Sequence, residues 1–101
     1  MKLILTIALG VALGISNAAF ADAASGQSTY AGKGCIGCHG VGGKSVVATY
    51  PSLTGKDAAF IKQNLTDFRS GARQNAVMNA MAAGLSDDDI NNLADYIGSL
   101  K

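Results

Sequence analysis

The chain has 101 residues, of which 49% are hydrophobic and 15% are charged. Its eight Lys and Arg residues are nearly balanced by seven acidic residues, so the formal net charge at pH 7 is +1. This balance lacks the basic excess typical of proteins that bind nucleic acids or anionic membrane surfaces, and neither partner is expected.

Residues 1–21 have the pattern of a secretory signal peptide. Lys2 precedes an apolar stretch over Leu3–Ile15, and Ala19-Phe20-Ala21 forms an A-x-A cleavage signature. The apolar stretch has 13 residues, short of the ~20 that a membrane-spanning helix needs, so an uncleaved anchor is the weaker interpretation. We expect cleavage after about Ala21, export to the periplasm, no stable membrane insertion afterwards, and one domain over residues 22–101.

A first helix is predicted from Ser25 to Cys35, with Gly26, Tyr30 and Ala31 on one face. Its C-terminal end would carry the run Cys35-Ile36-Gly37-Cys38-His39. A C-x-x-C-H run is the attachment signature of a c-type haem. The two thiols lie close enough to bond to the two vinyl groups of one porphyrin, and the next residue places an imidazole against the iron.

Cys35 and Cys38 are the only cysteines of the chain, and His39 is its only histidine. The sequence therefore predicts one covalently bound haem c, with His39 as one axial ligand of the iron. A thioredoxin-like redox pair, a Cys₂His zinc site and a plain disulfide are the alternatives. A zinc ion would need adjacent residues as ligands, and a thioredoxin-like pair needs a βαβ framework that this sequence does not indicate. Export favours the haem, because an exported dithiol without haem would oxidise.

The stretch from Gly40 to Gly55 is rich in glycine and contains Pro51, so it is predicted to be a loop, with room for a short extended piece at Val46-Val47. A second helix is predicted from Asp57, a good N-cap, to Ser70. Its apolar residues recur at helical spacing, and they are Phe60, Ile61, Leu65 and Phe68. Gly71 is expected to end it.

The segment from Ala72 to Gly84 carries Met78 and Met81 and has room for a short helix. The last helix is the clearest one. It is predicted to begin after Ser86 as N-cap, with Asp89 completing an approximate capping box. Its apolar stripe consists of Ile90, Leu93, Ala94, Ile97 and Leu100.

A six-coordinate haem iron needs a second axial ligand besides His39. A methionine sulphur, a lysine amine and an open position are all compatible with the sequence. With Met1 removed by cleavage, Met78 and Met81 are the remaining methionines. A methionine is more often core filler, but both have small neighbours that let the backbone approach a porphyrin face.

Several short motifs in the same order resemble the small class I c-type cytochromes of the bacterial periplasm, and also one half of their dihaem relatives. Besides the cysteine motif, they lie at Tyr50–Gly55, Lys62–Leu65, Phe68–Arg73, Met78–Asp87 and Leu93–Ile97. The resemblance implies an all-α cytochrome c fold, with three to four short helices wrapped around one covalently bound haem.

The resemblance also implies roles for particular residues. It places the ligand methionine eight residues before the serine that caps the last helix, which is Met78 here, with Met81 as the fallback. It implies that the Pro51 carbonyl accepts the Nδ1 proton of His39 and so orients the imidazole. It further implies a close crossing of the first and last helices through Gly26 and Tyr30, with Tyr96 as partner.

Ligation by histidine and methionine would leave no iron site for a substrate, so we expect a one-electron carrier cycling between Fe(III) and Fe(II), not an enzyme. Its partners would be periplasmic or membrane-bound redox proteins, and it would be a monomer. The alternatives are a haem enzyme or a peroxide or gas sensor with a labile methionine, and a binding module without haem. The stretch from Lys33 to Arg73 contains six basic residues and two acidic ones. This excess of positive charge indicates either docking onto an acidic partner or an ordinary solvated surface.

Overall fold

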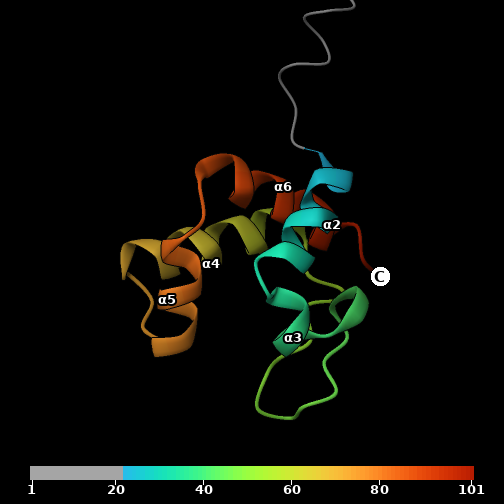
Figure 1. The fold of residues 1–101 in the computed structure, drawn as a ribbon, viewed down its shortest axis with the longest axis horizontal. Helices are drawn as coiled ribbons and strands as arrows, with labels where there is room; N and C mark the ends of the chain where they lie inside the picture. The colour runs from blue at the N-terminus through green and yellow to red at the C-terminus, as the bar shows by residue number, and fades with distance from the viewer. Residues whose placement is uncertain (1–21) are drawn as a thin grey trace, which may run out of the picture.

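The computed structural model describes residues 22–101, which are all-helical, with no strand in that range (Figure 1). The predicted signal peptide lies outside the described residues. The elements are α2 (Ala23–Gly32), α3 (Cys35–His39), the 3₁₀ turn η1 (Val41–Gly43), α4 (Ala58–Ser70), α5 (Ala76–Ala83) and α6 (Asp87–Gly98). The predicted all-α class is confirmed. Residues 22–101 form one α-helix more than the three to four expected, because the cysteine motif forms a short helix of its own in addition to the one allowed for in the methionine segment.

The first helix ends earlier than predicted. Helix α2 stops at Gly32, and Gly34 adopts a left-handed conformation with φ of 84°, after which the cysteine motif begins a new short helix. A left-handed residue cannot continue a right-handed helix, and glycine adopts that conformation at no steric cost. Gly26 and Tyr30 share one face, as predicted, and are buried there, but Ala31 is exposed and does not belong to that face.

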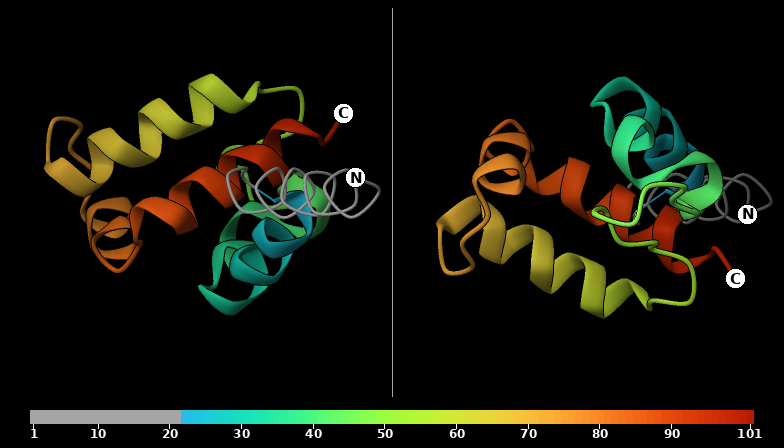
Figure 2. Two further views of the ribbon diagram at one scale, coloured as in Figure 1. Left: turned by 90° about the horizontal axis from the view of Figure 1, so that it is seen from above. Right: turned by 90° about the horizontal axis from the view of Figure 1, so that it is seen from below.

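Helices α2 and α6 cross closely at Gly26. A Cβ atom at this position would overlap the carbonyl oxygen of Asn92, so only glycine permits the approach. One turn further along, the rings of Tyr30 and Tyr96 lie 5.5 Å apart between centroids in a tilted arrangement. The two further views show α2 lying across α6 (Figure 2). The helix crossing that the family resemblance implies is therefore confirmed.

The predicted caps of α4 and α6 are also present. The Asp57 carboxylate accepts a hydrogen bond from the Phe60 backbone N–H at 2.8 Å, and Gly71 ends α4 with φ of 85°. Ser86 and Asp89 form a complete capping box at the start of α6. Helix α6 stops at Gly98, so Leu100 lies beyond it. The prediction that Leu100 belongs to the apolar stripe of this helix is therefore wrong.

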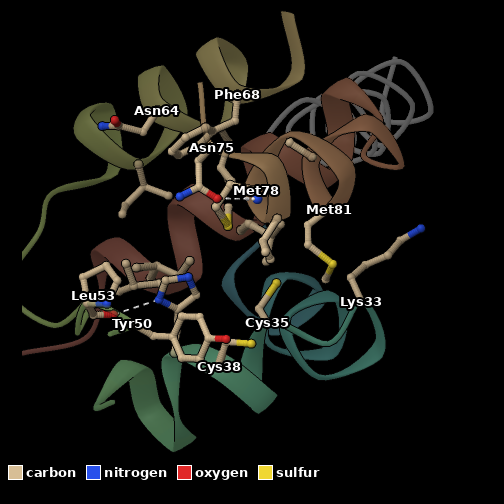
Figure 3. Close-up of a pocket in the computed structure, with 18 of the residues that line it drawn as sticks. Lys33, Cys35, Cys38, Tyr50, Leu53, Asn64, Phe68, Asn75, Met78 and Met81 are labelled. Atoms are coloured by element: carbon tan, nitrogen blue, oxygen red, sulfur yellow. Dashed lines mark hydrogen bonds between the residues drawn. The ribbon is translucent and has the colours of Figure 1, made fainter. Parts of the chain in front are cut away.

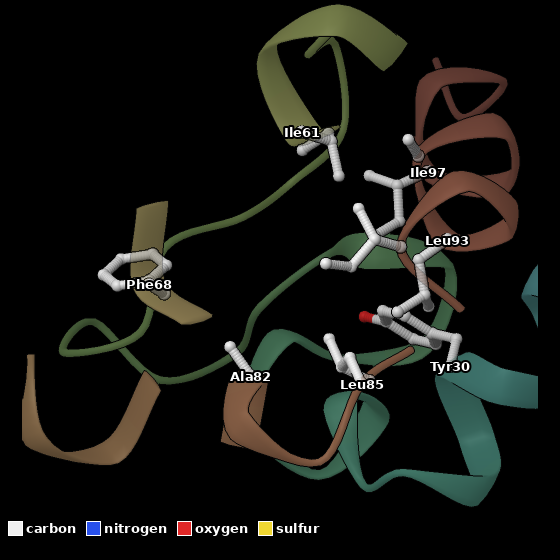
Figure 4. Close-up of a cluster of buried hydrophobic side chains, with 9 residues drawn as sticks. Tyr30, Ile61, Phe68, Ala82, Leu85, Leu93 and Ile97 are labelled. Atoms are coloured by element: carbon white, nitrogen blue, oxygen red, sulfur yellow. The ribbon is translucent and has the colours of Figure 1, made fainter. Parts of the chain in front are cut away.

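The segment from Gly40 to Gly55 is a loop as predicted, apart from η1. Val46-Val47 form bends, and the short extended piece proposed there is absent. The hydrophobic core lies along α6, where Leu93 and Ile97 meet Tyr30 of α2 and Ile61 of α4 (Figure 4). Within residues 22–101, no helix is long and apolar enough to cross a membrane.

Candidate functional site

A cavity of about 630 Å³ opens beside the core and brings the candidate site residues together (Figure 3). Its walls include Cys35, Cys38, His39, Met78 and Met81. Most of the remaining wall is apolar, with side chains from α4, α5 and α6 that also belong to the core. The volume falls within the range of about 300–1,000 Å³ that is usual for small-molecule and cofactor sites.

The cysteines lie on the one-turn helix α3. They are its first and fourth residues, so both side chains project from the same face, and both thiols are half-buried and form no disulfide. Burial raises the pKa of the Cys35 thiol. Redox-active dithiols depend on a lowered thiol pKa, so this environment does not favour a reactive thiolate.

A metal site built from protein ligands alone is not indicated either. Within residues 22–101, no group of three or more His, Cys, Asp or Glu side chains is placed to hold a metal ion. The Cys₂His zinc interpretation is therefore not favoured by the geometry.

His39 is oriented by the loop that follows it. Its Nδ1 lies 2.8 Å from the carbonyl oxygen of Pro51, the contact that the family resemblance implies. Because a carbonyl oxygen can only accept, Nδ1 carries the proton, and Nε2 is left with a free lone pair for a metal ion. The backbone after His39 is held by the Tyr30 hydroxyl, which donates a hydrogen bond to the Gly40 carbonyl at 2.6 Å.

The two methionines occupy different environments. Met78 is half-buried and packs against the core cluster. Met81 is 40% exposed and lies toward Lys33 at the side of the cavity (Figure 3). If Gly34 carried a Cβ atom, that atom would lie 3.6 Å from the terminal methyl group of Met81. A half-buried thioether that packs against the core is held more firmly toward the cavity than an exposed one, so the geometry favours Met78.

Asn75 and Asn79 were not among the sequence candidates. Asn75 is the N-cap of α5, and its side-chain oxygen accepts a hydrogen bond from the Met78 backbone N–H at 2.9 Å. An asparagine three residues before a candidate ligand, at the start of a helical segment, is a signal that could have identified it. Asn79 bonds Asn75, Arg73 and Phe68, and no local pattern indicates the contact with Phe68, which belongs to α4.

These observations fit a covalently attached haem. The cavity is apolar enough for a porphyrin, both thiols face it from one short helix, and an imidazole nitrogen and a thioether sulphur belong to separate parts of its wall. Such a donor set, one nitrogen and one soft sulphur, is typical of electron-transfer haem.

The cytochrome c family model matches residues 23–101. Cytochrome c-554(548) of Halomonas halodenitrificans is 38% identical over 81 residues, covering 77% of this chain and 95% of that protein. A thiosulfate dehydrogenase electron acceptor of Stutzerimonas stutzeri is 40% identical over 82 residues, covering 73% of this chain and 38% of that protein. The solved cytochrome c4 of Acidithiobacillus ferrooxidans superposes with a TM-score of 0.73 at 30% identity, over 80% of this chain and 51% of that one.

The chain thus spans nearly the full length of the first of these proteins, and about half or less of the other two.

Proposed function

This chain belongs to the cytochrome c family and is a haem-based electron carrier with one covalently bound haem c, in which we propose that Cys35 and Cys38 form the thioether bonds and that His39 and Met78 ligate the iron. The observation that carries this proposal is the meeting of these four side chains at one apolar cavity. When bound, the haem supplies an iron ion that accepts and releases one electron.

The protein residues would hold the iron in one environment through both oxidation states. The Pro51 carbonyl fixes the ring of His39 through Nδ1, which would leave Nε2 free to bind the iron. The Met78 thioether would favour ferrous iron and so would raise the reduction potential relative to a second histidine ligand. With His39 and Met78 as ligands, the iron would have no coordination site left for a substrate, so we propose a carrier without enzymatic activity. A haem enzyme or sensor with a labile methionine is not favoured.

We propose that the protein works in the periplasm after removal of residues 1–21. The signal-peptide pattern supports this location. The covalently bound haem supports this location too, because haem is attached to c-type cytochromes outside the bacterial cytoplasm.

Mass spectrometry and visible spectra of protein purified from a host that matures c-type haem test the proposal. We expect the mass of the chain from Asp22 plus one haem, and a charge-transfer absorption from the iron–sulphur bond. Met78→Ala should abolish that absorption, whereas Met81→Ala should retain it. A colourless product with the mass of the bare chain would overturn the haem assignment, and the reverse result for the two methionines would transfer the ligand role to Met81.

We propose that its partners are redox proteins and that each partner docks at the cavity with an acidic surface of its own. The cavity wall contains Lys33, Lys56 and Arg73 and no carboxylate, whereas α6 carries Asp87, Asp88, Asp89 and Asp95. This separation of charge would orient an acidic partner and speed its association at low salt. The name of the Stutzerimonas relative, an electron acceptor of a dehydrogenase, supports a redox enzyme as the partner.

The rate of electron transfer should therefore fall steeply as salt rises, and Lys33→Glu should weaken that dependence. A rate that is independent of salt would contradict docking by charge.

A further inference from the structure

We propose that Asn79 is the positioning residue that holds the Met78 thioether toward the iron. The proposal rests on the function proposed above and concerns the same site. Asn79 does not itself line the cavity, so it would act only through the placement of α5.

The side chain of Asn79 joins three segments of backbone. Its Oδ1 accepts a hydrogen bond from the Asn75 N–H at 2.9 Å, just before α5 begins. Its Nδ2 donates to the Phe68 carbonyl in the last turn of α4 and to the Arg73 carbonyl in the connection, each at 2.9 Å. One acceptor and both amide hydrogens are thereby used, and the amide cannot be flipped without losing all three bonds.

These bonds satisfy backbone groups that helix ends leave without partners. Phe68 lies among the last four residues of α4, whose carbonyls have no partner within the helix. Asn75 immediately precedes α5 and caps it by accepting the Met78 N–H. Asn79 therefore connects the end of one helix to the start of the next, and it directly follows Met78 in the chain.

Helix α5 depends on this connection because few of its own side chains are buried. It has eight residues, and Ala82 is its only buried one. Isolated helices of this length are marginal in water, and burying one alanine contributes little. The hydrogen bonds of Asn75 and Asn79 are thus a large part of what fixes Met78 against α4.

The consequence is measurable as the ease with which Met78 leaves the iron. An external ligand such as imidazole can bind the ferric haem only when the thioether detaches, so its apparent affinity reports the population of the detached state. Asn79→Ala should raise that affinity roughly tenfold, the change that corresponds to losing about 1.4 kcal/mol of positioning.

Asn79→Asp gives a sharper test because it preserves shape. The carboxylate can still accept from the Asn75 N–H, but it has no hydrogens for the Phe68 and Arg73 carbonyls and would repel both oxygens. We expect imidazole affinity at least as high as in Asn79→Ala, a weaker iron–sulphur absorption and a lower reduction potential. Should Asn79→Asp fail to fold, Asn79→Ala decides the question.

Asn92→Ala is the matched control. The Asn92 side chain also accepts a hydrogen bond from the backbone nitrogen of a residue outside its own helix, Asp22, at 2.9 Å, but Asn92 lies on α6 and does not line the cavity. It should lower stability in urea without changing imidazole affinity. If the two alanine variants raise imidazole affinity equally, or if Asn79→Ala leaves it unchanged, the proposal is wrong. Loss of the iron–sulphur absorption in Met78→Ala is checked separately, so a failure of the ligand assignment is distinguished from a failure of the positioning role.

Discussion

Gly26 shows how one hydrogen atom in place of a methyl group determines the packing of two helices. An added Cβ would overlap the Asn92 carbonyl and lie 2.7 Å from the Tyr96 Cβ. Gly26→Ala should therefore destabilise the holoprotein by about 1–3 kcal/mol, the usual cost of overpacking. Gly32→Ala is the control in the same helix, because a Cβ there meets nothing within 4 Å.

Alanine is the better helix former, so Gly32→Ala should be neutral or stabilising by up to about 1 kcal/mol. Urea unfolding of both variants measures the difference. Equal losses in the two variants would show that the crossing is less tight than the structure indicates.

Tyr30 gives a prediction about alkaline pH. Burial raises the pKa of Tyr30 to about 12 from its ordinary value of 10.0. The unfolded chain releases this proton near pH 10 while the folded chain keeps it, so the contribution of Tyr30 to stability is complete below about pH 10 and is lost as pH rises toward 12. Tyr30→Phe should remove the part of the alkaline loss in unfolding free energy that comes from Tyr30. The variant also lacks the hydrogen bond to the Gly40 carbonyl, which is worth about 1 kcal/mol.

The measurement is the urea stability of both proteins from pH 8 to pH 11.5. The gap between wild type and Tyr30→Phe should narrow as pH rises past 10. A gap that stays constant would mean that the phenol titrates normally in the folded protein.

At the scale of the helix, the caps are the features that sequence predicts best, because they depend on residues three positions apart. Ser86→Ala removes one half of the capping box of α6 and should cost about 1 kcal/mol in urea unfolding. Ser28→Ala, at an exposed position inside α2, should change stability by less than about 0.5 kcal/mol. If both serines cost the same, the loss at Ser86 cannot be assigned to capping.

The boundary between α2 and α3 shows where local patterns are insufficient. Glycines stand at positions 32, 34 and 37, and all three are compatible with a helix end. Only Gly34 has a positive φ, and its neighbours do not distinguish it from the other two. The sequence therefore predicts one helix reaching Cys35, whereas the chain turns at Gly34 and presents the thiols from a separate helix.

The candidate site likewise contains residues that sequence predicts and residues that it does not. The cysteine motif and His39 could be identified from sequence because covalent attachment requires a fixed spacing. The choice between Met78 and Met81 needed the family resemblance, since burial separates them and burial is a property of the fold. Asn79 could not be found at all, because its partner at Phe68 belongs to another helix.

At the scale of the whole molecule, the cavity and the core share their walls. Ile61, Phe68, Leu93 and Ile97 each belong to both, so the side chains that stabilise the fold are also those that would contact the porphyrin. A domain of this size buries only about 60–65% of the surface that its unfolded chain exposes and is marginal without further apolar contacts. The haem would supply those contacts from within.

Haem removal should therefore unfold the domain, not merely inactivate it. The double variant Cys35→Ala, Cys38→Ala, produced without haem, would have to keep a cavity of about 630 Å³ beside its core, and unfilled volume is costly because the surrounding side chains lose their contacts. We expect little helical circular dichroism at 25 °C and no cooperative urea transition. The same variant reconstituted with free haem should regain part of the helix signal, because the apolar contacts do not require the thioether bonds. A cooperative transition in the haem-free protein would show that α6 and its partners form a sufficient core alone.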